Sequence, residues 1–160
     1  MHPGHWSKDH SPAIKEIRKC KWCGNDFETT NKRDAKCCSR SCASRYREFK
    51  TLEKRLNAAT TDAEKIKIQF QKYRIDASFR FSLKDFPDEF DFSLIESYGW
   101  YKAKNHGNNL SGISRDHMYS IKDGFLNNVD PKLLAHPANC RLIRQSENAS
   151  KRDRSCITLE

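Results

Sequence analysis

The chain has 160 residues, of which 36% are hydrophobic and 32% are charged, and its formal net charge is +9. This length suits one domain or two very small ones. The composition disfavours a single large core and favours small modules stabilised by bound metal. The longest apolar runs span only a few residues, and the first ten residues lack the apolar core of a secretory signal. We therefore expect a soluble, cytoplasmic protein that has no membrane partner.

Positive charge gathers towards both ends of the chain. Lys and Arg outnumber Asp and Glu by 14 to 7 in residues 1–57 and by 10 to 6 in residues 99–160. Residues 58–98 contain 6 basic and 8 acidic residues. Many basic proteins simply have solvated lysines. Two separate basic blocks, however, favour a polyanion such as nucleic acid as the partner.

The N-terminal segment, residues 1–19, shows no apolar periodicity. It contains His2, His5 and His10, but nothing in the sequence fixes their geometry as a metal site. We therefore interpret this segment as a mobile arm.

The seven cysteines indicate a metal site, because the chain lacks a signal peptide that would favour disulfides. Cys20 and Cys23 form a C-x2-C pair followed by Gly24, which suits a tight knuckle whose amides point at thiolates. Cys38 and Cys42 form a C-x3-C pair at the expected start of a helix, where residues four apart share one face. Four thiolates hold Zn²⁺ tetrahedrally, so we predict a structural zinc site with these four ligands.

Cys37 leaves the ligand set ambiguous, since it directly precedes Cys38 and could replace it. Only Cys38 keeps the four-residue spacing to Cys42, so we interpret Cys37 as a small apolar neighbour of the site. The pattern resembles a treble-clef-like zinc finger. Cys140 and Cys156 lack partners at ligand spacing, and we predict that both are small buried residues.

A helix is expected after the second cysteine pair. Apolar residues recur at spacings of three and four up to Leu56, and basic residues occupy much of the remaining surface. The basic face is either an ordinary solvated face or a phosphate-contacting surface, and its place in a basic block favours the second. The DNA contacts predicted on it are Arg40, Arg45 and Arg47.

The middle of the chain is expected to be largely helical. Thr61 to Glu64 matches a capping box, although Ile66–Phe70 also alternates as a strand would. Residues 76–90 mix aromatic residues with charge and a proline, which indicates an ordered connection. Asp91 is placed to cap a short helix that ends at Gly99.

The C-terminal segment predicts the order strand, loop, strand, helix. The first strand begins near Gly112, and a long loop runs from Ser120 to Pro137. A second strand covers Cys140–Ile143, and Ser146 is placed to cap the final helix. The pair of Asp116 and His117 can face one site only if the first strand ends or twists there.

Four polar side chains of this segment are able to converge: Asp116, His117, Asn139 and Asn148. The segment resembles the HNH endonuclease family, the ββα-metal nucleases, and in particular its phage-type and homing-endonuclease members. The DH pair, the SIKDGF loop, HPANCRL and EN-x-x-K match the family pattern in order and spacing, most clearly over residues 92–151. Asn148 stands where other members carry histidine, which is an accepted variation.

The resemblance assigns His117 as the general base, a role that suits a neutral imidazole. Asp116 and Asn148 offer oxygen ligands to Mg²⁺ or Mn²⁺ and leave positions open for water and phosphate. Asn139 would hold the loop and orient the ring of His117. The role of His136 stays open between phosphate contact, assistance to the metal and local packing.

Four further basic residues are predicted DNA contacts, with an ordinary surface charge as the alternative for each. They are Arg115, Arg141, Arg144 and Lys151. The expected fold class is α+β, with a small zinc-stabilised module and helices followed by a ββα-metal nuclease module. We expect an arm, zinc module and basic helix in residues 1–57, a helical and aromatic connection in 58–98, and the nuclease module in 99–160.

The leading hypothesis is a metal-dependent endonuclease that hydrolyses phosphodiester bonds of double-stranded DNA, and the resemblance places it in a phage-infected cell. The alternatives are a zinc-finger DNA-binding or packaging accessory whose HNH-like module is idle, and a toxin-like nonspecific nuclease. The oligomeric state stays open. Residues 157–160 look like the start of another element.

Overall fold

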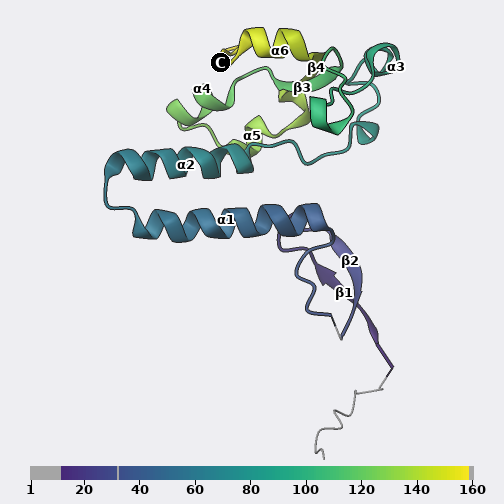
Figure 1. Ribbon diagram of the computed structural model, residues 1–160, viewed down its shortest axis with the longest axis vertical. Helices are drawn as coiled ribbons and strands as arrows, with labels where there is room; N and C mark the ends of the chain where they lie inside the picture. The colour runs from purple at the N-terminus through teal and green to yellow at the C-terminus, as the bar shows by residue number, and fades with distance from the viewer. Residues whose placement is uncertain (1–11, 32, 159–160) are drawn as a thin grey trace, which may run out of the picture. The chain divides into compact units, whose positions relative to one another are not determined.

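A computed structural model describes residues 12–31 and 33–158 of the chain (Figure 1). The expected N-terminal arm up to residue 11, with its three histidines, and the last two residues lie outside this description. The chain divides into two compact units, Met1–Thr51 and Leu52–Glu160, with the boundary inside helix α1 (Arg40–Ala58). Helices alternate with two small antiparallel sheets, which confirms the α+β class.

The first unit contains a β-hairpin. Strand β1 (Lys15–Lys19) pairs antiparallel with β2 (Asp26–Thr30), and Gly24 in the connecting turn adopts a φ of +77°. The prediction of an arm up to residue 19 is therefore wrong from Lys15 onward. Ile17 at the centre of β1 is 76% exposed. A strand that buries no apolar face leaves no alternating pattern to detect.

Helix α1 begins where the sequence predicted. Ser39 accepts a hydrogen bond from the amide of Cys42 at 3.1 Å, which satisfies one of the free amides of the first turn. Within the first unit, Phe49 of α1 meets Trp22 edge to face, with ring centroids 6.1 Å apart. Such aromatic pairs stabilise a small module beyond the area they bury.

Helix α2 (Asp62–Asp76) begins at the predicted cap, where Thr61 Oγ1 accepts from the amide of Glu64 at 3.3 Å. The ambiguity over Ile66–Phe70 is resolved as helix. Ile68 is fully buried while Ile66 is 55% exposed, so the two side chains lie on different faces. The segment therefore buries one stripe of a helix, as expected for a surface helix.

Two short helices replace the loop expected from Ser120 to Pro137. They are α4 (Ile121–Leu126) and α5 (Pro131–Leu134), and a 3-10 helix η3 (Pro137–Asn139) follows. Ser120 Oγ accepts from the amide of Asp123 at 3.0 Å, and Asp130 Oδ1 accepts from Lys132 at 2.9 Å. The turn-forming residues that predicted a loop are thus the caps of helices too short to show a helical period.

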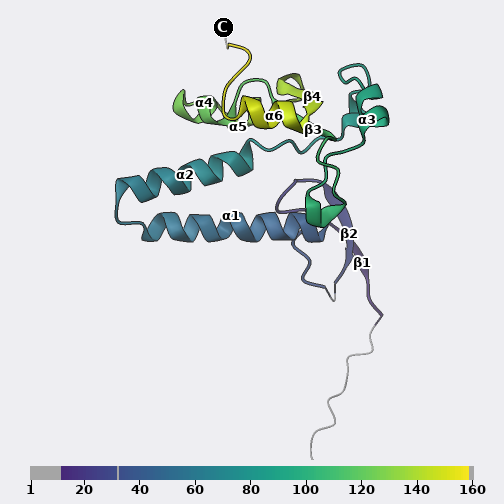
Figure 2. The ribbon, with the colours of Figure 1, turned by 45° about the horizontal axis from the view of Figure 1, so that its top comes forward.

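The second sheet is formed by β3 (Ile113–His117) and β4 (Cys140–Arg144), in a register that places His117 opposite Cys140. Helix α6 (Gln145–Lys151) packs against both strands (Figures 1 and 2). The predicted order of strand, strand and helix is confirmed. Ser146 lies inside the first turn of α6, because the capping position falls on Arg144.

The apolar core of the second unit forms against this sheet. Its buried members are Leu83, Phe90, Ile113, Cys140 and Leu142. Partly buried aromatic residues of the segment 79–92 pack around them. Burial of these rings explains why the connecting segment predicted at residues 76–90 is ordered, since each buried ring removes a large apolar area from water.

The remaining short elements follow the sequence closely. Helix α3 (Ser93–Tyr98) starts after Asp91, whose Oδ1 accepts from the amide of Ser93 at 3.0 Å, and ends at Gly99 with a φ of +64°. Two 3-10 helices complete the set, η1 (Leu83–Asp85) and η2 (Lys104–His106). Over the described part of the chain, no helix has both the length and the apolar character needed to cross a membrane.

Candidate functional site

The four predicted zinc ligands lie together in the first unit. The Sγ atoms of Cys20, Cys23, Cys38 and Cys42 all lie within 4.8 Å of one another. That of Cys38 is 3.6 Å from Cys23 and 3.5 Å from Cys42. Tetrahedral Zn²⁺ with bonds of about 2.3 Å spaces its sulfurs about 3.8 Å apart. The printed distances lie close to that spacing and the widest stays within about 1 Å of it, so the four cysteines are placed to bind a metal ion, and four thiolates favour zinc.

The surroundings of the cluster shift the pKa values of two of its thiols in opposite directions. Burial raises the pKa of the Cys20 thiol, but the amides of Cys23, Cys38 and Trp22 outweigh it and lower that pKa to about 6. Hydrogen bonds with the sulfurs of Cys42 and Cys23 raise the pKa of Cys38 to about 12. Cys20 is thus ready to bind as a thiolate at neutral pH, whereas a cation has to displace the proton of Cys38.

The other cysteines lie outside the cluster. Cys37 is half-buried, and burial raises its pKa. Its sulfur does not belong to the cluster, so Cys38 rather than Cys37 is placed to bind a metal, as predicted. Cys140 is buried, as predicted, and burial raises its pKa to about 11. The prediction for Cys156 is wrong, because this residue is exposed. The amide of Cys156 donates to Met118 O at 2.8 Å and its thiol lies 3.4 Å from the same oxygen, but the side chain stays exposed.

A cavity of about 430 Å³ in the second unit is lined by the predicted general base His117 and the predicted metal ligands Asp116 and Asn148. Strand β3 supplies the first two and α6 supplies the third. His117 is the last residue of β3. Since the strand ends there, the alternation of its side chains does not prevent both members of the pair from lining one cavity.

Asp116 is a buried carboxylate between two cations. Arg141 Nε donates to its Oδ2 at 2.9 Å, and Lys151 Nζ donates to its Oδ1 at 2.7 Å. Asp116 is only 5% exposed, so solvent screens these pairs weakly. Lys151 also donates to the carbonyl of His117. Two residues predicted to contact DNA therefore hold the carboxylate, an interaction that the sequence analysis missed.

The ring of His117 is fixed by residues from the segment after α2. Its Nε2 lies 2.8 Å from the carbonyl oxygen of Ala77, and the ring stacks on Phe79 with centroids 3.9 Å apart. A carbonyl only accepts, so Nε2 carries a proton and Nδ1 is the acceptor of the neutral ring. Burial lowers the pKa of His117, while the contacts with Ala77 and Asp116 partly offset this. The imidazole is therefore neutral at physiological pH.

Asn148 offers an unused oxygen to the same cavity. Its Nδ2 donates to Ser114 Oγ at 3.1 Å, which fixes the orientation of the amide. Among the residues that the structure describes, no group donates to Asn148 Oδ1. Lys151 lines the same cavity one helical turn further on, as its spacing of three residues predicted.

Asn139 binds the backbone that follows His117. Its Oδ1 accepts from the amide of Tyr119 at 2.7 Å, and its Nδ2 donates to the carbonyls of Tyr119 and Leu134 at 3.2 and 3.0 Å. Asn139 is 8% exposed, so these bonds satisfy a buried amide. It holds the loop, as the resemblance implies, while Ala77 and Phe79 orient the ring of His117.

The remaining predicted residues fall into different surroundings. His136 is exposed, and its Nδ1 accepts from the amide of Ala138 at 3.2 Å, so it caps η3. Arg115 lines the cavity and donates to the carbonyl of Phe81 at 3.1 Å. Arg144 stacks over the ring of Tyr98 at 3.8 Å. In the first unit, three exposed arginines lie on α1: Arg40, Arg45 and Arg47.

No protein family model matches the chain, and no curated protein or solved structure matches it either. Any assignment of function therefore depends on the residues of the chain and the geometry in which they lie.

Proposed function

We propose that this protein is a metal-dependent DNA endonuclease of the HNH type, homing-like or free-standing and phage-derived, that hydrolyses phosphodiester bonds. The observation that carries the proposal is the single cavity lined by Asp116, His117 and Asn148. A neutral imidazole, a carboxylate and an amide oxygen are the groups that metal-assisted hydrolysis of a phosphodiester requires.

His117 acts as the general base. Its Nε2 proton is held by the carbonyl of Ala77, so Nδ1 takes the proton from the attacking water. The water oxygen forms a bond to phosphorus, and the bond from phosphorus to the 3′-oxygen breaks. The products carry a 5′-phosphate and a 3′-hydroxyl. The lowered pKa of His117 favours this role, because a general base has to be unprotonated when substrate arrives.

Asp116 and Asn148 would hold Mg²⁺ or Mn²⁺, since both offer the hard oxygen ligands that these cations prefer. The bound cation would neutralise charge on the phosphate and stabilise the leaving oxygen. Asp116 Oδ2 can keep its bond to Arg141 during this, because a carboxylate has about four acceptor sites. Lys151, in contrast, uses the same Oδ1 that the cation would approach.

Double-stranded DNA is the proposed substrate. Five cationic side chains line the cavity against two carboxylates: Arg74, Arg115, Lys122, Lys151 and Arg152 against Asp116 and Asp153. Such an excess of positive charge attracts a phosphate backbone. The four-cysteine cluster would hold a structural Zn²⁺, and the exposed arginines of α1 would add further backbone contacts.

A zinc-finger DNA-binding accessory with an idle nuclease module is the second candidate. The observation that favours it is that both carboxylate oxygens of Asp116 are already paired, one with Arg141 and the other with Lys151. In that case the ion pairs would serve only the stability of the module, and the basic surfaces would bind DNA without cutting it.

A plasmid-nicking assay separates the two candidates. Zinc-loaded protein is incubated with supercoiled plasmid in Mg²⁺ and in Mn²⁺, with EDTA added in a parallel reaction. We expect nicks that DNA ligase reseals, which shows 5′-phosphate and 3′-hydroxyl ends. His117→Ala abolishes nicking, while His106→Ala, at an exposed histidine of η2 that does not line the cavity, leaves it unchanged. Intact plasmid with the wild-type protein in both metals would favour the accessory.

A further inference from the structure

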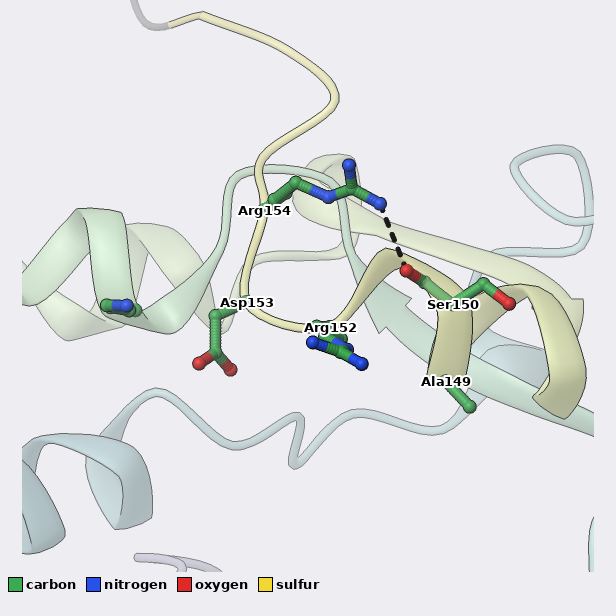
Figure 3. A pocket seen from close by; sticks show the side chains of 6 residues that line it. Ala149, Ser150, Arg152, Asp153 and Arg154 are labelled. Atoms are coloured by element: carbon green, nitrogen blue, oxygen red, sulfur yellow. Dashed lines mark hydrogen bonds between the residues drawn. The ribbon is translucent and has the colours of Figure 1, made fainter.

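A second cavity opens beside the proposed catalytic cavity, at the C-terminal end of α6 (Figure 3). Its volume is about 870 Å³. It is lined by Lys122, Ala149, Ser150, Arg152, Asp153 and Arg154. Three of these residues, Lys122, Arg152 and Asp153, also line the catalytic cavity. The two cavities therefore adjoin along a shared lining.

Two exposed cations at this junction, Lys122 and Arg152, have side chains that form neither a hydrogen bond nor an ion pair with the described residues. The pKa of Asp123 is nevertheless lowered by its hydrogen bond with Ser155 and, to a smaller degree, by the charge of its neighbour Lys122. Arg154 differs, because its guanidinium is already bonded to the carbonyls of Ser150 and Lys151 at 3.0 and 3.2 Å. Lys122 and Arg152 thus keep all their donors available for a ligand.

The chain around Arg152 is held on both sides. On one side, Arg154 binds the last carbonyls of α6, and Figure 3 draws its bond to Ser150. On the other side, the amide of Ser120 donates to Ser155 Oγ at 2.8 Å, and Ser155 in turn binds Asp123. A segment anchored in this way loses little conformational entropy when a ligand binds to it.

We propose that Lys122 and Arg152 form a phosphate-binding subsite for the backbone of duplex DNA, next to the phosphodiester in the catalytic cavity. The position relative to that phosphodiester rests on the proposed function, whereas the binding of the backbone does not. The planar guanidinium of Arg152 matches two phosphate oxygens, and Lys122 adds a compact charge.

The lining of the second cavity favours a duplex over an unpaired strand. None of its lining residues is aromatic, so it offers no surface on which unpaired bases can stack. Binding of DNA at this cavity relies on charge and is therefore independent of base sequence. Asp153 is the single carboxylate of the lining and opposes the phosphate. Its removal therefore strengthens binding.

The test measures DNA binding by fluorescence anisotropy, with the full zinc-loaded chain carrying His117→Ala to prevent cleavage. The probes are labelled duplexes of two unrelated sequences and the corresponding single strand, over a range of salt concentrations. Lys122→Gln and Arg152→Gln each weaken duplex binding equally for both sequences. Each also lowers the slope of log K against log salt by about one. Asp153→Asn strengthens binding.

The matched control is Lys132→Gln, at an exposed lysine of α5 that lines neither cavity. It leaves affinity and salt slope unchanged, and circular dichroism shows that all variants stay folded. If both Lys122→Gln and Arg152→Gln bind duplex DNA with the affinity and salt slope of the wild type, the proposed subsite is wrong. A loss of binding confined to the single strand overturns the assignment to duplex. Weakened duplex binding together with an inactive wild-type protein supports the subsite and refutes the nuclease.

Discussion

The ammonium of Lys151 lies 2.7 Å from Oδ1 of Asp116, where α6 meets β3. The Lys151 side chain is only 11% exposed, so the pair is largely shielded from water. The same carboxylate oxygen is the proposed ligand of a divalent cation. The lysine and the cation therefore compete for one charge, and the strength of the ion pair controls how readily the cation binds.

Replacing Lys151 tests this competition directly. Lys151→Met keeps the apolar stem and removes the charge, so we expect Mn²⁺ to bind more tightly. A hydrogen bond to a charged group contributes about 1.5–3 kcal/mol, which corresponds to a gain of roughly tenfold to a hundredfold in affinity. Titration calorimetry of the zinc-loaded chain measures it, with Lys132→Met as the matched control. Unchanged or weaker binding in Lys151→Met contradicts the proposed place of the cation.

The ligand set of the zinc centre is tested by two neighbouring cysteines. Cys38→Ser removes a sulfur of the cluster, and Cys37→Ser removes the half-buried thiol beside it. We expect about one zinc per chain in the wild type and in Cys37→Ser. Cys38→Ser and Cys23→Ser lose the metal and destabilise the first unit, because metal binding contributes to folding. Metal analysis of the purified variants provides the measurement, and zinc retained in Cys38→Ser refutes this set.

The lowered pKa of His117 makes stability depend on pH. Below its ordinary value of 6.5 the unfolded chain binds a proton at this residue before the folded chain does, so stability falls as pH falls. The contribution is fully present above pH 6.5 and is lost towards the lower pKa of the folded state. Urea unfolding between about pH 5 and 7 detects it. His117→Gln removes this contribution to the dependence of the unfolding free energy on pH. If the wild type and His117→Gln show the same dependence, the pKa shift is contradicted.

Gly112 has no room for a side chain. A Cβ at this position would lie 2.4 Å from the amide nitrogen of Tyr101 and 2.5 Å from the carbonyl carbon of Trp100. Both atoms belong to the backbone, so the neighbours cannot rotate away. We expect Gly112→Ala to lower the free energy of unfolding by about 1–3 kcal/mol, measured by urea denaturation. Ser111→Ala, at an exposed neighbour, is the control and changes it little.

Short-range patterns predicted their elements well. Thr61 was recognised as a cap because its side chain bonds an amide only three residues away. Asp91 bonds the amide of Ser93 at the start of α3, but the capping position itself falls on Phe92. The short helices α4 and α5 were missed for a related reason. Six and four residues span too few turns for an apolar period to appear. Strand β1 was missed because its hairpin leaves Ile17 exposed.

The sequence by itself determined which four cysteines are placed to bind a metal ion and which residue types line the proposed catalytic cavity. Cys20 with Cys23, and Cys38 with Cys42, reach one ion because a knuckle and one helical turn bring such close neighbours together. The tertiary structure alone decided what surrounds the polar residues. Ala77 meets His117 across 40 positions, and Lys151 meets Asp116 across 35. Contacts over such separations depend on how the core packs, which no local spacing encodes.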